Sequence, residues 1–199
     1  FPSKVLNSVN MKIESDEKVG LIGKNGAGKT SLLKLIAGFY PFEKGRMIIN
    51  GSVSSVINSS ESLIPDATGL ENIKLQLLRN KVSKKEIDNK IQIISDFTEL
   101  NSKLLQPIKT MSLGMKVKIV LSVAINLNNN ILVIDEDINA LDDYFFNKFL
   151  EKIKNISTLI IATHDLKIIK KVCSKCIHLE NGSIKEFGLT DKVIINYKN

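Results

Sequence analysis

The chain has 199 residues, of which 43% are apolar and 25% are charged, and its mean hydropathy is +0.04. These values are typical of one globular domain, and no run reaches the roughly 18 apolar residues that a membrane-spanning helix needs. No basic-then-apolar leader opens the chain, so nothing indicates secretion. The net charge of +7 fits either a nucleic-acid or membrane-surface partner or a lysine-rich solvated surface. Because Lys, Asn and Ile dominate throughout, the second interpretation is favoured.

The first sixty residues alternate expected strands with one helix. Residues 5–13 alternate apolar and polar side chains in part, which predicts a strand, and the apolar run at 18–22 predicts a second, buried strand. Residues 31–38 predict a helix that ends at its glycine. Two further strands are expected at 45–50 and 52–57, on either side of an Asn-Gly turn.

The middle of the chain, from residue 69 to 126, has a helical pattern. Ser83 and Glu86 have the spacing of a capping box, in which the serine oxygen accepts a backbone N–H and the glutamate answers it. Two apolar stripes at helical spacing follow: Ile87, Ile91 and Ile94, and then Leu113, Val117, Leu121 and Ala124. The sequence therefore predicts one domain with a core lobe at about 1–68 and 127–199 and an inserted helical lobe at about 69–126.

The last third returns to strands and helices in alternation. Residues 130–134 form an apolar run followed by acids, as in a parallel strand with a site at its carboxyl end. An amphipathic helix is expected at 143–154 and a second buried strand at 157–162. Two more strands are expected at 176–180 and 183–187, around an Asn-Gly turn. This order predicts an α/β core with a helical insert.

The two cysteines, Cys173 and Cys176, have a C-x-x-C spacing that serves zinc binding or redox chemistry in some proteins. One such pair supplies only two of the four ligands of a structural zinc site. Two incidental thiols in a reduced cytosolic chain are therefore expected.

Residues 23–30 read Gly-Lys-Asn-Gly-Ala-Gly-Lys-Thr and match the phosphate-loop pattern G-x-x-x-x-G-K-[ST]. Successive backbone N–H groups can hold phosphate oxygens in such a loop, and the following helix directs its positive end at them. We expect Lys29 to reach the β- and γ-phosphates and Thr30 to offer its hydroxyl to Mg²⁺. The predicted ATP-binding residues are Gly23, Lys24, Asn25, Gly26, Ala27, Gly28, Lys29, Thr30 and Ser31.

Two acids, Asp135 and Glu136, end the apolar run at 130–134. Beside a phosphate loop, Asp135 is placed to hold the magnesium shell and Glu136 to polarise the attacking water, although acids can also merely cap a strand. His164 follows another buried strand and can donate a hydrogen bond to the γ-phosphate. The predicted catalytic residues are Glu136, His164 and Lys29.

Together these segments resemble an ATP-binding cassette (ABC) ATPase over essentially the whole chain. The order is specific: Walker A at 23–30, a signature-like segment at 111–115, Walker B at 131–135, Glu136, a D-loop-like segment at 139–142 and His164-Asp165. The resemblance implies an α/β P-loop NTPase core with an inserted helical subdomain and antiparallel β elements, which binds ATP and Mg²⁺.

The signature-like segment also has a physical interpretation, because Ser112 can cap a helix that begins near Leu113 and so presents free N–H groups. The resemblance implies a homodimer in which Ser112, Gly114 and Met115 meet the ATP of the second copy. It further implies that Asp142 belongs to the D-loop and that Phe1 stacks on adenine.

The chain departs from the usual family pattern at several positions. Leu113 replaces a glycine, Met115 replaces a glutamine, and Asp137 stands where a proline is common. The expected place of the Q-loop glutamine, residues 58–61, reads Asn-Ser-Ser-Glu, which puts the role of that loop in doubt.

These departures, with residues 51–73 and the C-terminal segment from Cys173 to Tyr197, resemble the ATPase subunits of bacterial polysaccharide, O-antigen and teichoic acid exporters. That resemblance implies a separate transmembrane permease and a peripheral place on the cytoplasmic face of the bacterial membrane. Three alternatives remain open: another exporter type, a non-transport cassette acting on nucleic acid or ribosomes, and a nucleotide-binding regulator without turnover. Glu136 argues against the regulator, and nucleic acid is not expected as a partner because tandem cassettes and long coiled-coil insertions are absent from the sequence.

Overall fold

The computed structural model describes residues 5–41 and 43–198, which fall into two compact units. The first unit holds the described residues up to Ile57, Asn129–Asn139 and the residues from Lys154 onward, and the second holds Asn58–Asn128 and Ala140–Ile153. The second unit is larger than the helical lobe expected from the sequence. It includes residues 58–68 and a further helix, because both pack on the helices that the pattern identified.

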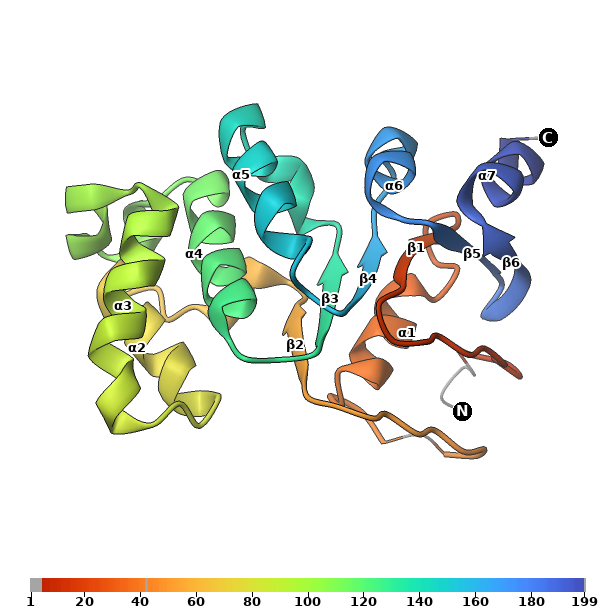
Figure 1. Cartoon of the computed structure of the whole chain (residues 1–199), viewed down its shortest axis with the longest axis horizontal. Helices are drawn as coiled ribbons and strands as arrows, with labels where there is room; N and C mark the ends of the chain where they lie inside the picture. The colour runs from red at the N-terminus through yellow and green to blue at the C-terminus, as the bar shows by residue number, and fades with distance from the viewer. Residues whose placement is uncertain (1–4, 42, 199) are drawn as a thin grey trace. The chain divides into compact units, whose positions relative to one another are not determined.

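The first unit is built on one six-stranded sheet in the order β2-β3-β4-β1-β5-β6 (Figure 1). All neighbours are parallel except β5 and β6, which pair antiparallel through a bulge between His178 and Leu179. The strands are β1 Lys18–Ile22, β2 Val53–Val56, β3 Ile131–Asp135, β4 Thr158–Ala162, β5 Lys175–Glu180 and β6 Ser183–Leu189. An α/β fold of the expected class is confirmed.

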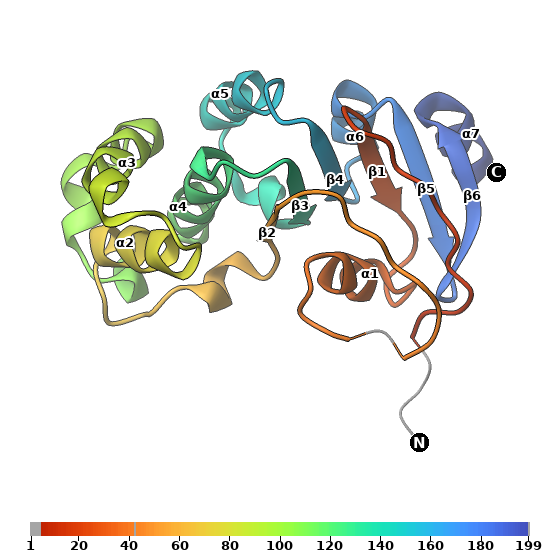
Figure 2. The ribbon, with the colours of Figure 1, turned by 60° about the horizontal axis from the view of Figure 1, so that its bottom comes forward.

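Helices cover both faces of this sheet. Helix α1 (Lys29–Ile36) lies on one face, and α6 (Leu166–Val172) and α7 (Thr190–Lys198) lie on the other (Figure 2). The side-chain alternation of β1 explains the division, since Val19 and Leu21 are fully buried in the core cluster that includes α1. Gly20 points the other way, where an added Cβ would meet Ile169 of α6 at 2.6 Å. The central strands β3 and β4 are nearly continuous apolar runs, as expected for parallel strands covered on both faces.

The second unit is helical. It contains α2 (Gly69–Arg79), α3 (Lys84–Thr98), α4 (Leu113–Asn126) and α5 (Asp143–Ile153), with short 3₁₀ turns at Ser59–Ser62, Asn101–Leu105 and Ile108–Thr110. Asn72, which is 2% exposed, bonds the backbone of Ile64, Ala67 and Thr68 and so fixes the loop before α2. Phe145 of α5 packs edge-on against Phe97 of α3, with ring centroids 5.4 Å apart.

Two expected strands are absent from the described residues: 5–13 and 45–50 have no strand pairing. Leu6, Val9, Met11 and Ile13 of the first segment still pack against the core cluster, as does Ile49 of the second. Ser8 has a left-handed φ of 50°, which interrupts an extended backbone. The alternation therefore predicted most of the side chains that pack on the core, but it did not predict whether the backbone joins a sheet.

Two helix predictions also need correction. Ser83 begins α3 without accepting a backbone N–H, and its hydroxyl instead donates to Glu86 at 2.5 Å. A complete capping box lies at Thr68 and Glu71, at the start of α2. Leu113 is 55% exposed, because it is the first residue of α4 and only the following turns are covered. From Val117 onward α4 is buried almost all round.

Within the described ranges, no helix has both the length and the apolar character required to cross a membrane.

Candidate functional site

The phosphate-loop residues connect β1 to α1, as the motif requires. Gly23 has φ 155° and Gly28 has φ 101°, and an added Cβ at Gly23 would lie 2.3 Å from the carbonyl oxygen of Leu179. Both positions need glycine, the first also because another backbone passes so close. The side chain of Lys29 is 6% exposed, and its Nζ donates to the carbonyl oxygen of Gly23 at 2.9 Å. The loop is thus closed around its own lysine.

The loop presents an outer edge and a buried wall. Lys24, Asn25, Gly26 and Thr30 are exposed, Ser31 is intermediate, and the remaining predicted loop residues, Gly23, Ala27, Gly28 and Lys29, are buried. The buried wall is tied to the strand turn between β5 and β6, where the N–H of Gly182 donates to the carbonyl oxygen of Ala27 at 3.0 Å. The exposed edge is the part that a ligand can reach.

Thr30 and Asp135 meet although they lie 105 residues apart. The Thr30 hydroxyl donates to Asp135 Oδ2 at 2.6 Å, and Asp135 is only 6% exposed at the carboxyl end of β3. A hydroxyl and a carboxylate are oxygen donors of the kind that Mg²⁺ takes together with substrate phosphates and water. No group of three or more His, Cys, Asp or Glu able to hold a metal occurs in the described residues. The pair therefore fits a magnesium ion that takes most of its ligands from elsewhere.

The register of the sheet brings the remaining site residues to the same edge. Asp135 of β3 is paired with Ala162 of β4, and Ala162 is paired with Leu21 of β1. These parallel strands therefore end at one level, and the residues just beyond them emerge together. Glu136, His164 and the phosphate loop follow the three strand ends.

Glu136 lies between two cationic or proton-bearing side chains. His164 Nε2 is 2.8 Å from Glu136 Oε1, and Lys29 Nζ is 3.6 Å from the same oxygen. The backbone of Glu136 has a left-handed φ of 46°, and its N–H donates to the carbonyl oxygen of Ala162 at 2.8 Å. The carboxylate is 43% exposed, so solvent reaches it.

Thr163 supports this arrangement, and the sequence did not single it out. Its side chain is buried, and its hydroxyl donates to Asn139 Oδ1 at 3.2 Å while accepting the N–H of Asp165 at 3.1 Å. It thereby joins the loops that follow β3 and β4. The available signal was a hydroxyl residue directly before His164 at the end of a buried strand.

The other predicted residues lie in the second unit or outside the described residues. Ser112 Oγ accepts the N–H of Met115 at 3.3 Å and caps α4 as expected. Gly114 lies in the first turn of this helix, and Asp142 directly precedes α5. Phe1 lies outside the described residues.

Cys173 and Cys176 are free and buried. Burial is the main cause that raises the pKa of both thiols, that of Cys176 to about 12. A buried thiol with a raised pKa is chemically inert.

The family model described as ABC transporter matches residues 6–139. The chain belongs to the ABC transporter family. It is 36% identical to the O-antigen export system ATP-binding protein of Yersinia enterocolitica, over 91% of this chain and 77% of that relative. It is also 36% identical to the teichoic acids export ATP-binding protein of Enterococcus faecalis, over 97% of this chain and 44% of that relative. The chain spans about half the length of the teichoic acid relatives it matches.

Solved structures agree with this ABC assignment. The structure of an ATP-binding subunit of an ABC transporter superposes with a TM-score of 0.86 at 25% identity, covering 100% of this chain and 89% of that one. A dimeric post-hydrolysis cassette, MJ0796 bound to ADP and phosphate, gives a TM-score of 0.83 at 21% identity over 94% and 90% of the two chains. The second likeness concerns the fold alone. The family and the exporter relatives expected from the sequence are confirmed.

Proposed function

We propose that this chain binds and hydrolyses ATP with Mg²⁺, and that it drives a polysaccharide exporter whose permease is a separate membrane subunit. The observation that carries the proposal is the convergence of Lys29, the Thr30–Asp135 pair, Glu136 and His164 at one edge of the sheet. A binder without turnover has no need of an exposed carboxylate held beside a histidine and a phosphate-loop lysine.

The phosphate loop holds the nucleotide in this proposal. Its backbone N–H groups and the N-terminus of α1 face the phosphates, and Lys29 exchanges its contacts with loop carbonyls for phosphate oxygens. The other proposed ATP-binding residues are Gly23, Lys24, Asn25, Gly26, Ala27, Gly28, Thr30 and Ser31. Thr30 and Asp135 would hold Mg²⁺, and the bound ion would neutralise charge on the phosphate oxygens.

Hydrolysis requires a base and a donor near the γ-phosphate. Glu136 polarises the attacking water, and its exposure leaves room for that water. His164 Nε2 lies 2.8 Å from the Glu136 carboxylate, and in this proposal His164 donates to the γ-phosphate once ATP is bound. Lys29 stabilises the charge that develops on the transferred group.

The second half of the site comes from a second copy of this chain. Ser112 caps the start of α4, and the uncovered N–H groups of that helix turn, with Gly114 and Met115, are directed at the partner's nucleotide. The dimeric cassette among the solved structures supports an arrangement of two copies. Asp142 belongs to the D-loop of the same interface.

The cargo follows from the relatives alone. Their printed names describe export of teichoic acids and O-antigen, so a lipid-linked polysaccharide and a membrane permease are the proposed substrate and partner. The place of action is the cytoplasmic face of the bacterial membrane. Pull-down of a permease with the intact protein would support this role, whereas RNA or DNA binding at physiological salt would favour a non-transport cassette.

Lys29→Ala tests nucleotide binding. Loss of the lysine removes the cation that reaches the phosphates, so titration calorimetry should find no ATP binding. Lys34→Ala, on the same helix but outside the loop, should bind like the parent. ATP binding by Lys29→Ala with the parent's affinity would refute the phosphate-loop assignment.

Glu136→Gln tests hydrolysis separately from binding. The amide keeps the shape of the side chain and loses the base, so turnover should fall about 10²-fold or more while ATP binding persists. The variant should also form an ATP-stabilised dimer, which gel filtration detects. Glu180→Gln changes an acid at the end of β5 and is the matched control. If Glu136→Gln hydrolyses ATP like the parent, the assignment of the base is wrong.

A further inference from the structure

The start of α4 is held closely against residues 140–142 of the same unit. An added Cβ at Gly114 would lie 2.7 Å from the carbonyl oxygen of Ala140, so the two backbones are in direct contact there. Leu113, one position earlier, is 55% exposed and meets no such restriction. The structure thus explains why this chain keeps one glycine of the signature-like segment and carries leucine in place of the other.

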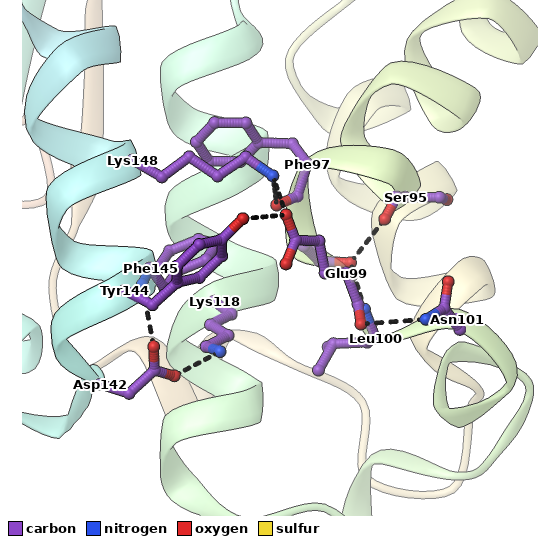
Figure 3. Close-up of polar contacts among 11 residues, drawn as sticks. Ser95, Phe97, Glu99, Leu100, Asn101, Lys118, Asp142, Tyr144, Phe145 and Lys148 are labelled. Atoms are coloured by element: carbon purple, nitrogen blue, oxygen red, sulfur yellow. Dashed lines mark hydrogen bonds and ion pairs between the residues drawn. The ribbon is translucent and has the colours of Figure 1, made fainter.

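Asp142 ties the same segment to the second turn of α4. One carboxylate oxygen pairs with Lys118 Nζ at 2.5 Å, and the other accepts the N–H of Phe145 at 2.8 Å (Figure 3). Lys118 also lies over the Phe145 ring, 5.0 Å from its centroid, and its side chain is 18% exposed. The Lys118 hydrogen bond, followed by the Phe145 N–H, lowers the pKa of Asp142, so the carboxylate stays charged near neutrality.

A second, similar ion pair fastens α5 to the end of α3. Lys148 Nζ is 2.6 Å from Glu99 Oε1 and lies 4.8 Å from the Phe97 ring centroid. Tyr144 donates to the same carboxylate oxygen at 3.2 Å. Both lysines pair with a carboxylate and cover an aromatic ring, but only Lys118 belongs to α4. The chain therefore supplies its own matched control.

The first turn of α4 is capped by the Ser112 side chain, which accepts the N–H of Met115. It contains no acidic residue to stabilise its N-terminus, and Ser112 and Leu113 are exposed. Lys118 stands six residues after Ser112, about 9 Å along the axis at 1.5 Å per residue. The ion pair between Lys118 and Asp142 therefore restrains the direction of the turn that carries Ser112, Gly114 and Met115.

We infer that Asp142 and Lys118 are positioning residues, which hold the start of α4 in the orientation that presents Ser112 and Gly114 to the nucleotide of a second copy. This inference rests on the proposed function. It assigns to the D-loop aspartate a task within its own subunit, namely fixing the helix from which the signature segment acts.

Four variants of the full chain test this inference. Lys118→Met keeps the aliphatic stem and removes the charge, and Asp142→Asn keeps an acceptor for the α5 cap while losing the ion pair. Both should lower kcat at least tenfold at fixed protein concentration, with the ATP affinity of the chain changed less than twofold. Lys118→Arg should retain most of the parent's kcat. Lys148→Met, which breaks the second ion pair, should leave kcat within twofold.

Amide hydrogen exchange of residues 112–118 in the nucleotide-free chain gives a second readout that is independent of turnover. Exchange should accelerate in Lys118→Met and Asp142→Asn and stay unchanged in Lys148→Met. Equal losses of kcat in Lys118→Met and Lys148→Met would overturn the inference, as would unchanged exchange in Lys118→Met. A parent chain without turnover would refute the proposed function, while exchange at the start of α4 would still decide whether the ion pair positions it.

Discussion

Gly114 offers the sharpest separation between stability and function in this chain. Gly114→Ala places a methyl group 2.7 Å from the carbonyl oxygen of Ala140, whereas ordinary contact begins at 3.4 Å. The neighbouring backbones must therefore move apart by several tenths of an ångström. Overpacking of this kind costs about 1–3 kcal/mol, and replacing glycine by alanine within a helix returns up to about 1 kcal/mol.

The net loss in the free energy of unfolding is therefore about 0–3 kcal/mol, and a loss of 1 kcal/mol lowers Tm by about 2–4 °C in a chain of this size. Turnover should suffer more. A displacement approaching 1 Å in a group that acts on a substrate can cost about 10²-fold in rate. Gly114→Ala should thus remain folded and bind ATP, but hydrolyse it about 10- to 100-fold more slowly.

The assay compares steady-state ATPase activity with thermal unfolding for Gly114→Ala and Leu113→Gly. Leu113 is exposed, so Leu113→Gly removes no buried contact and should change kcat less than threefold. If Gly114→Ala keeps the parent's kcat, or if Leu113→Gly causes the larger loss, the contact between Gly114 and Ala140 does not govern the signature segment.

Two further predictions concern stability. Thr68→Val removes the side-chain acceptor of the capping box at α2, where Thr68 Oγ1 accepts the N–H of Glu71 at 3.2 Å. This variant should lower the free energy of unfolding, measured in urea, by about 1 kcal/mol. Ser83→Ala should lower it by less, and a larger loss for Ser83→Ala would contradict the assignment of the caps. Burial, and next the charge of Glu186, raise the pKa of the Cys176 thiol from 9.0 to about 12. The thiol therefore ionises at lower pH in the unfolded chain, so its contribution to the free energy of unfolding should be full below pH 9 and should fall as the pH rises toward 12. Cys176→Ala should make the decline in stability above pH 9 shallower, and an unchanged slope would refute this cause.

The features that the sequence predicted well are those encoded in consecutive residues. The phosphate loop, the acids after 130–134 and the buried strands each depend on a short run of side chains. The meeting of Glu136 with His164 was also accessible, because both follow apolar runs that parallel pairing brings to one edge. The bond between Thr30 and Asp135 follows from the same rule.

The errors arose where one pattern serves two structures. Residues 5–13 and 45–50 pack partly buried apolar side chains on the core cluster without joining the sheet, and periodicity cannot distinguish this case from a strand. Thr68 and Ser83 each have a glutamate three residues later in the sequence. Only the Thr68 side chain accepts the backbone N–H of that glutamate. The contacts of Thr163, Lys118 and Asp142 join segments that are distant in the sequence, so no local pattern predicts them.

Glu136 shows what such contacts accomplish. A non-glycine residue with φ 46° costs about 1–3 kcal/mol and persists only where its surroundings hold it there. The surroundings do so through its N–H on Ala162 and through the Thr163–Asn139 bond, which fixes the loop on its other side. The turned backbone directs the carboxylate toward His164 and Lys29 instead of along the strand. The strained residue, Glu136, is also the proposed base. The backbone strain therefore lowers the stability of the fold at the position where the proposed chemistry needs a fixed carboxylate.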